Sequence, residues 1–172
     1  MTDTSNAMGS NSVSGASVEV TGAADGASRA GNALGVELYD DATLAEAREF
    51  FSKDVYASEQ TGVTVEAVGK NYAKCSLEIG KQHCNAYGGV MGGVMFTLAD
   101  FTFAVSSNFR QGHTVSVTSQ INFTGMAKGK KLIAESRLIK DGRTVCLYAI
   151  DITDELGTKV AFVTFSGMKL AK

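Results

Sequence analysis

Apolar and polar residues alternate along most of the chain after residue 60, with the period of two that is typical of a half-buried strand. The clearest case is residues 73–79, where Ala73, Cys75, Leu77 and Ile79 are apolar and the residues between them are polar. Short glycine-containing turns join the last three such segments, which indicates antiparallel neighbours. Strands are predicted in residues 63–67, 73–79, 114–123, 131–140, 143–153 and 158–170.

Two segments have a helical pattern instead. Residues 41–55 carry apolar side chains at the spacing of a helix, with Asp41 or Thr43 as the expected cap. Residues 92–108 are apolar on all sides, which is typical of a buried helix, and their single ionisable group is Asp100. This segment is too short for a membrane span and has a charge at its middle, so no membrane association is expected.

The order of these elements predicts the fold class. Two strands, one very apolar helix and four strands follow one another. A single curved antiparallel sheet wrapped around that helix covers every apolar face. An α+β domain is therefore predicted for residues 37–172.

The first 36 residues have a different composition. Residues 1–36 are rich in Ser, Gly, Ala and Asn, contain no aromatic residue and show no apolar stripe. Such a segment cannot bury enough surface to offset the entropy of ordering it, so a disordered tail is predicted. It also lacks the basic start and apolar block of an export signal, which favours a cytoplasmic protein.

Composition excludes several classes of partner and cofactor. Apolar residues make up 44% of the 172 residues, which is enough for one core. The net charge of −2 provides no basic excess for a nucleic acid. Cys75, Cys84 and Cys146 are odd in number and lack the spacing of metal ligands, so reduced structural thiols are expected. No metal and no other cofactor is predicted.

The segment around the apolar helix resembles a known family. Asn85, Gly92, Gly93 and Asp100 stand at the spacings found in hotdog-fold thioesterases of the phenylacetate-degradation (PaaI-like) type, which show Asn six residues before a His-Gly-Gly motif and an acidic residue nine after that His. The resemblance covers about residues 60–169. It implies the hotdog fold, in which a curved antiparallel sheet wraps one long central helix, and hydrolysis of acyl-CoA thioesters.

Two positions depart from the family pattern. Met91 stands where the family has its His, so no imidazole is available at that position to contact a substrate carbonyl. The two histidines of the chain, His83 and His113, lie in predicted loops outside the matching frame. The Pro that is common after the third strand is absent, and Gly125 and Met126 occupy that stretch.

The resemblance implies a role for three residues, and each role has a physical basis. Gly92 lies at a helix N-terminus, where unpaired N–H groups can polarise a thioester carbonyl and no Cβ blocks its approach. Asp100 can act as a general base on water or attack directly as a nucleophile, and the sequence leaves this choice open. Asn85 is expected to hold the attacking water or the carbonyl through its amide.

The spacing of these residues predicts an oligomer. Gly92 and Asp100 are eight residues apart on one helix, hence about 12 Å along its axis. They cannot both touch one thioester, so a site that uses both must take them from two chains. A homodimer is expected on this ground, and the resemblance implies a homotetramer that is a dimer of dimers.

Five further residues are candidates for contact with acyl-CoA. Met91 and Gly93 flank Gly92, and Ser116 lies where some family members place a hydroxyl that assists the carboxylate. Lys140 and Arg143, beside a predicted turn, are the candidate cations for the phosphates of CoA. Structural interpretations stay open for all the site residues: a buried structural acid, packing glycines, an Asx-turn asparagine or a solvated turn charge.

Two other functions compete with thioester hydrolysis. The chain could be an acyl-CoA-binding hotdog oligomer that the loss of the His has inactivated. Retention of Asp100 and Asn85 speaks against this, because an inactive site needs neither. A hotdog dehydratase would need a His in a matching frame, which neither His83 nor His113 provides.

Overall fold

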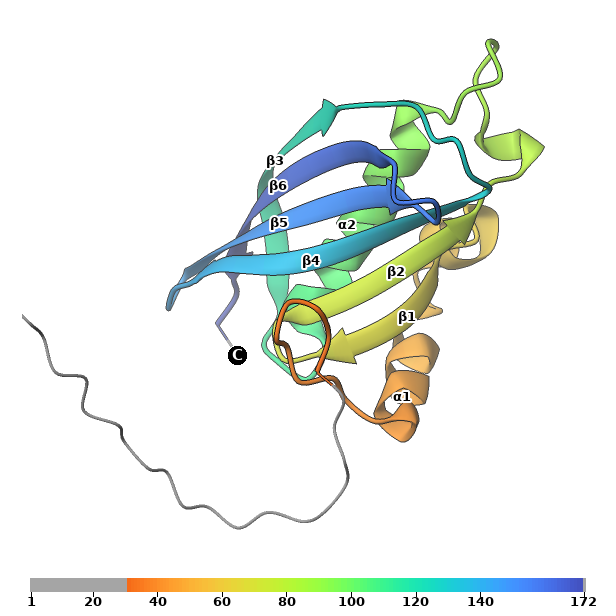
Figure 1. The fold of residues 1–172 in the computed structure, drawn as a ribbon. Helices are drawn as coiled ribbons and strands as arrows, with labels where there is room; N and C mark the ends of the chain where they lie inside the picture. The colour runs from red at the N-terminus through yellow and green to blue at the C-terminus, as the bar shows by residue number, and fades with distance from the viewer. Residues whose placement is uncertain (1–30, 172) are drawn as a thin grey trace, which may run out of the picture.

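Residues 31–171 are described by a computed structural model, and they form one curved sheet of six strands (Figure 1). Every pair of neighbouring strands is antiparallel. In spatial order the strands are β1 (Thr64–Gly69), β2 (Tyr72–Glu78), β4 (Lys131–Asp141), β5 (Val145–Asp154), β6 (Lys159–Lys169) and β3 (Thr114–Phe123).

The long helix α2 (Gly92–Asn108) crosses the concave side of this sheet and contacts all six strands (Figure 1). Its bounds are those that the apolar run predicts. The hotdog architecture expected from the order of elements is therefore confirmed. No helix within residues 31–171 is long and apolar enough to cross a membrane.

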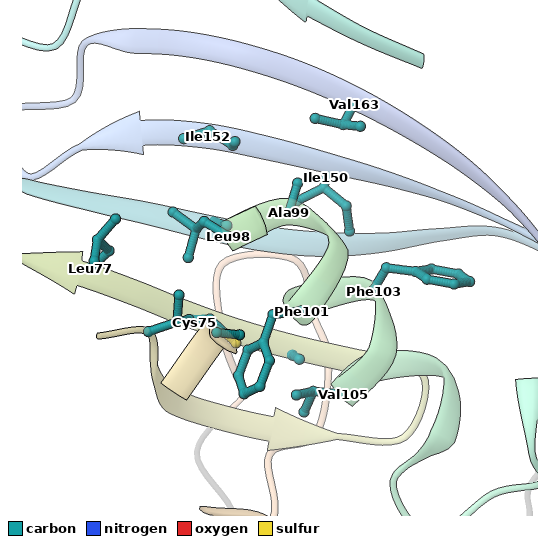
Figure 2. Packing of buried hydrophobic residues seen from close by; sticks show 14 of the residues in the cluster. Cys75, Leu77, Leu98, Ala99, Phe101, Phe103, Val105, Ile150, Ile152 and Val163 are labelled. Carbon is teal, nitrogen blue, oxygen red and sulfur yellow. The ribbon is translucent and has the colours of Figure 1, made fainter. Parts of the chain in front are cut away.

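The core lies between α2 and the middle of the sheet. Leu98 and Ala99 on the helix are fully buried and face Ile150 and Ile152 of β5 (Figure 2). One turn further on, the ring of Phe103 stacks on a sheet residue, Phe165, with 4.9 Å between ring centroids. Packing of this kind on several strands fixes the position of the helix, and therefore the position of every side chain that α2 carries.

The first helix is shorter than predicted. α1 spans Asp41–Phe51 rather than residues 41–55, and its cap is Asp40, whose carboxylate accepts the Thr43 N–H. The helix ends where the Ser58 hydroxyl donates to the carbonyl oxygens of Ser52 and Asp54.

A short π-helical turn, Tyr56–Gln60, follows this break and is labelled with the η elements. The break and the turn bring residues 54–57 against the side of α2. Residues 54 and 55 of the predicted helix 41–55 therefore lie outside α1, and they line a cavity beside α2.

Most of the predicted N-terminal tail, residues 1–30, lies outside the described residues. The described remainder, residues 31–36, forms a turn in which the Asn32 side chain accepts the N–H groups of Leu34 and Val36. The Asn32 amide also donates to Glu135 on β4. These contacts attach the segment before α1 to the outer face of the sheet.

Strand β3 is one edge of the sheet and is exposed on both faces. The period-two pattern assigns Val115, Val117, Ile121 and Phe123 to one apolar face, but Val117 is 64% and Phe123 57% exposed in the single chain. A register shift between Ser116 and Thr118 interrupts the alternation. An unpaired edge of this length, with Val117 and Phe123 exposed on it, is a surface that a second strand can cover.

A buried carboxylate fixes two loops at the end of the sheet near the start of α2. Asp154 is 1% exposed and accepts four backbone N–H groups, those of Lys128, Gly129, Leu156 and Thr158, at 2.8–3.1 Å. Burial alone would raise the pKa of Asp154, but these hydrogen bonds outweigh it and hold the pKa well below its usual range.

Replacing Asp154 by Asn should lower the thermal midpoint by several degrees, because an amide cannot accept all four N–H groups. Since the folded-state pKa is depressed, the contribution of Asp154 is present above about pH 4 and is lost as the pH falls through the folded value. Thermal melts of both proteins should therefore converge at acid pH. Asp151→Asn, at an exposed position of the same strand, is the control. Equal midpoints at pH 7 for wild type and Asp154→Asn would contradict this role.

Candidate active site

The N-terminus of α2 is held by a hairpin that consists of residues 83–91. The Met91 N–H donates to the His83 carbonyl oxygen at 2.8 Å, and Cys84 and Val90 form a bridge. His83 is 3% exposed, and its Nδ1 accepts the Gly80 N–H at 2.9 Å. Its Nε2 is the one buried side-chain N or O atom within residues 31–171 that has no hydrogen-bond partner.

Asn85 stands at the tip of this hairpin. Its Oδ1 accepts the N–H groups of Tyr87 and Gly89, at 2.9 and 3.2 Å, so the carbonyl end of the amide makes an Asx turn. The residue is exposed and lines a cavity. Asn85 therefore has the structural role that the sequence left open, and its Nδ2 remains available as a donor.

The first turn of α2 offers backbone donors. Gly92 and Gly93 begin the helix, so their N–H groups have no acceptor four residues back within it. The preceding residue, Met91, makes no side-chain cap. A Cβ at Gly92 would lie 2.8 Å from Cζ of Phe123, which is closer than side chains tolerate. A larger residue at position 92 would therefore have to displace the Phe123 ring that β3 places against it.

A cavity of about 520 Å³, here called the Gly92 cavity, opens beside this turn. Its walls come from the hairpin, from Met95 on α2 and from the loop that Asp154 holds in place. Its lining residues include Asn85, Gly89, Gly92, Phe123 and Met126.

Asp100 lies in a different cavity of about 580 Å³, here called the Asp100 cavity. It is half-buried, and burial raises the pKa of its carboxyl group, with the negative charge of Asp54 adding to the effect. No residue within 31–171 makes a hydrogen bond or ion pair with its side chain. The other walls are Val55, Tyr56, Ala57, Phe96, Thr97, Phe101 and Ala104.

The remaining predicted contact residues lie apart from both cavities. Met91 and Gly93 are exposed neighbours of Gly92, and Ser116 is exposed on β3 opposite Gly167. Lys140 is at the exposed end of β4.

Arg143 is exposed in the turn that follows β4. That turn lies near the C-terminal end of α2. Val145, just after the turn, pairs with Met168 of β6, and the next residue of β6 pairs with Thr114 of β3. The Thr114 N–H in turn donates to the side-chain oxygen of Asn108, the last residue of α2. Within one chain, the structure does not bring Lys140, Arg143 or Ser116 to Gly92.

Two residues of the cavities carried no signal in the sequence. Asp54 was hidden inside the predicted helix 41–55, whose apolar spacing gives no sign of a break after Phe51. Phe123 ends a strand, and only the fold shows that its ring meets Gly92.

Comparisons with known proteins identify the family of this chain. A family model described as the acyl-CoA thioesterase N-terminal domain matches residues 77–167. Acyl-coenzyme A thioesterase 13 of Mus musculus is 28% identical over 101 residues, which cover 57% of this chain and 72% of that protein. A putative esterase of Archaeoglobus fulgidus is 25% identical over 115 residues, which cover 66% of this chain and 75% of that protein.

Solved structures show the same fold. The E. coli PaaI protein from the phenylacetic acid degradation operon superimposes with a TM-score of 0.69 at 18% identity, over 76% of this chain and 95% of that chain. A hypothetical thioesterase protein with coenzyme A from Streptococcus pneumoniae has a TM-score of 0.65 at 22% identity, over 71% of this chain and 98% of that chain. The chain belongs to the acyl-CoA thioesterase family, and the expected PaaI-like hotdog fold is confirmed.

The contact between Gly92 and Phe123 can be tested by a pair of substitutions. Gly92→Ala should lower kcat by about 10-fold or more, because the new methyl group displaces the ring or the helix start that carries the N–H donors. Phe123→Leu in the same chain should restore part of the loss by making room for the methyl group. Release of free thiol from an acyl-CoA measures both. A double variant no more active than Gly92→Ala, with Phe123→Leu alone fully active, would rule out steric coupling.

Proposed function

We propose that the protein hydrolyses acyl-CoA thioesters to a free acid and CoA, with Asp100 as the reacting carboxylate. The observation that carries this proposal is the environment of Asp100. It is the single ionisable side chain of α2, half-buried among apolar groups, and no described residue neutralises it. Burying a carboxylate without a partner is costly, so such a group is more often functional than structural.

The raised pKa of Asp100 suits either of two mechanisms. As a general base, the carboxylate takes a proton from water, the resulting hydroxide attacks the thioester carbon, and the C–S bond breaks to release CoA. As a nucleophile, the carboxylate attacks that carbon itself, and the C–S bond breaks to release CoA as its thiolate. Water then hydrolyses the resulting mixed anhydride, which frees the acid and restores the carboxylate. A more basic carboxylate is more effective in both.

The polarising N–H of Gly92 is assigned to a second copy of the chain. Within one chain Gly92 and Asp100 lie in separate cavities and are about 12 Å apart along α2. The exposed apolar edge β3, with Val117 and Phe123, supports the pairing of two chains, because edge pairing would cover both side chains. We therefore infer a homodimer with two shared sites; Asn85, beside Gly92, would hold the water or the carbonyl through Nδ2.

Asp100→Asn is the decisive variant. It keeps size and hydrogen-bonding capacity but removes basicity, so kcat should fall on the order of 10²-fold or more while the chain still folds. In the wild type, kcat/KM should fall as the pH drops through the raised pKa of Asp100, and this limb should be absent from any residual activity of the variant. Thiol release from a panel of acyl-CoAs across pH provides both readouts.

Stability gives an independent check on the same variant. A carboxyl group with a raised folded-state pKa makes the fold less stable once the pH rises through that pKa, so Asp100→Asn should melt no lower than wild type at pH 7. Asp41→Asn, exposed at the start of α1, is the matched control and should keep full activity. A folded Asp100→Asn protein with the wild-type rate would exclude the mechanism. Wild-type protein that binds acyl-CoAs but hydrolyses none would favour the binding oligomer.

The shared site predicts complementation. An Asp100→Ala chain and a Gly92→Val chain should each be nearly inactive, because each lacks one half of every site. After subunits are exchanged by mild denaturation and refolding, mixed dimers contain one site with both halves intact, so activity should return to a maximum of about one quarter of wild type. This value assumes random pairing, in which about half of the dimers are mixed. No recovery under conditions that demonstrably exchange subunits would show that each chain holds a complete site.

A further inference from the structure

The Asp100 cavity has an unbalanced set of charges. Its ionisable lining groups are Asp54, Asp100 and the phenol of Tyr56, and no Lys, Arg or His within residues 31–171 lines it. The rest of its wall is apolar or aromatic, apart from Thr97. A ligand group that enters this cavity therefore meets apolar surface and negative charge, without a cation to offset it.

Hydrogen bonds hold the backbone at Asp54, so the point from which its side chain extends is defined. The Asp54 N–H donates to the Phe51 carbonyl oxygen at 3.1 Å, and the Asp54 carbonyl oxygen accepts the N–H groups of Ala57 and Ser58 at 3.0 and 2.9 Å. Within the described chain, no residue makes a hydrogen bond or ion pair with the carboxylate itself. The side chain is exposed and lines the cavity.

The field of Asp54 reaches the reacting group. After burial, the charge of Asp54 is the other cause that raises the pKa of Asp100. A negative charge that acts on Asp100 also acts on a charged substrate group bound next to Asp100. The effect is moderate, because solvent around an exposed side chain screens it.

The acyl half of the thioester suits this cavity better than the CoA half. The pantetheine arm carries amides that need hydrogen-bonding partners, and its far end carries phosphates that two carboxylates would repel. The Gly92 cavity offers hydrogen-bonding partners for such amides, because Asn85 and glycine-rich loops line it. The apolar walls at Val55, Phe96 and Phe101 match a hydrocarbon group instead.

We propose that Asp54 is a specificity-determining residue that rejects acyl groups ending in a carboxylate, so that the substrates of this site carry uncharged acyl groups. The inference rests on the proposed function, because it places the acyl group beside Asp100. Repulsion between like charges can discriminate between two acyl groups of equal carbon number, because the rest of the two acyl groups makes the same hydrocarbon contacts.

The test compares acyl-CoAs in pairs of equal carbon number: butyryl with succinyl, hexanoyl with adipoyl, and octanoyl with suberoyl. For each pair, the ratio of kcat/KM of the neutral substrate to that of the carboxylated one is measured for the wild type, Asp54→Asn and Asp54→Ser. The ratio should be well above one in the wild type and should fall by about 5-fold in both variants, because one of the two repelling charges is gone. The change should shrink at high ionic strength.

Glu59→Gln is the matched control, since Glu59 lies on the π-helical turn that follows Asp54, is exposed and does not line the cavity. Its ratio should stay within about 2-fold of the wild type. A wild-type ratio near one, or an unchanged ratio in both folded Asp54 variants, overturns the proposal. Asp100→Asn is assayed in parallel on the neutral substrates. Full activity there would refute the proposed mechanism, whereas an inactive Asp100→Asn with unchanged Asp54 ratios refutes the specificity role alone.

Discussion

The structure depends on one constraint, which is that most of the surface of α2 is apolar and must be buried. Six antiparallel strands curve around the helix because no flat layer could contact it from enough directions. The same burial gives the two polar features of α2 their importance. The helix start at Gly92 exposes N–H donors, and Asp100 is held among hydrocarbon groups, where its basicity rises.

Much of the fold could be predicted because it follows from local patterns. The 17-residue run with one charge gave the bounds of α2, and period two located the strands. The end of α1 could not be predicted, since the apolar spacing continues past Phe51 and the break depends on hydrogen bonds made by Ser58. The exposure of Val117 also escaped prediction, because whether a face is covered depends on which strand is the edge.

Of the site, the sequence could supply residue types and their spacing but not their surroundings. Gly92 and Asp100 were identified by position, and their separation into two cavities agrees with the distance along the helix. The contact of Phe123 with Gly92 joins residues 31 positions apart, beyond any local pattern. Met91 contributes no imidazole, and His83 faces it across the hairpin with its Nδ1 occupied by Gly80, so the donors that the first turn of the helix offers are backbone amides.

The Asp154 carboxylate has a consequence for how the protein can change over evolution. One side chain binds the backbone of residues 128–129 and of residues 156–158 at once, and the first of these loops continues into a wall of the Gly92 cavity. An insertion in either loop would pull its amides away from the shared acceptor. The two loops must therefore vary together, and sequence change in the turn at residues 156–158 is restrained by the shape of the Gly92 cavity.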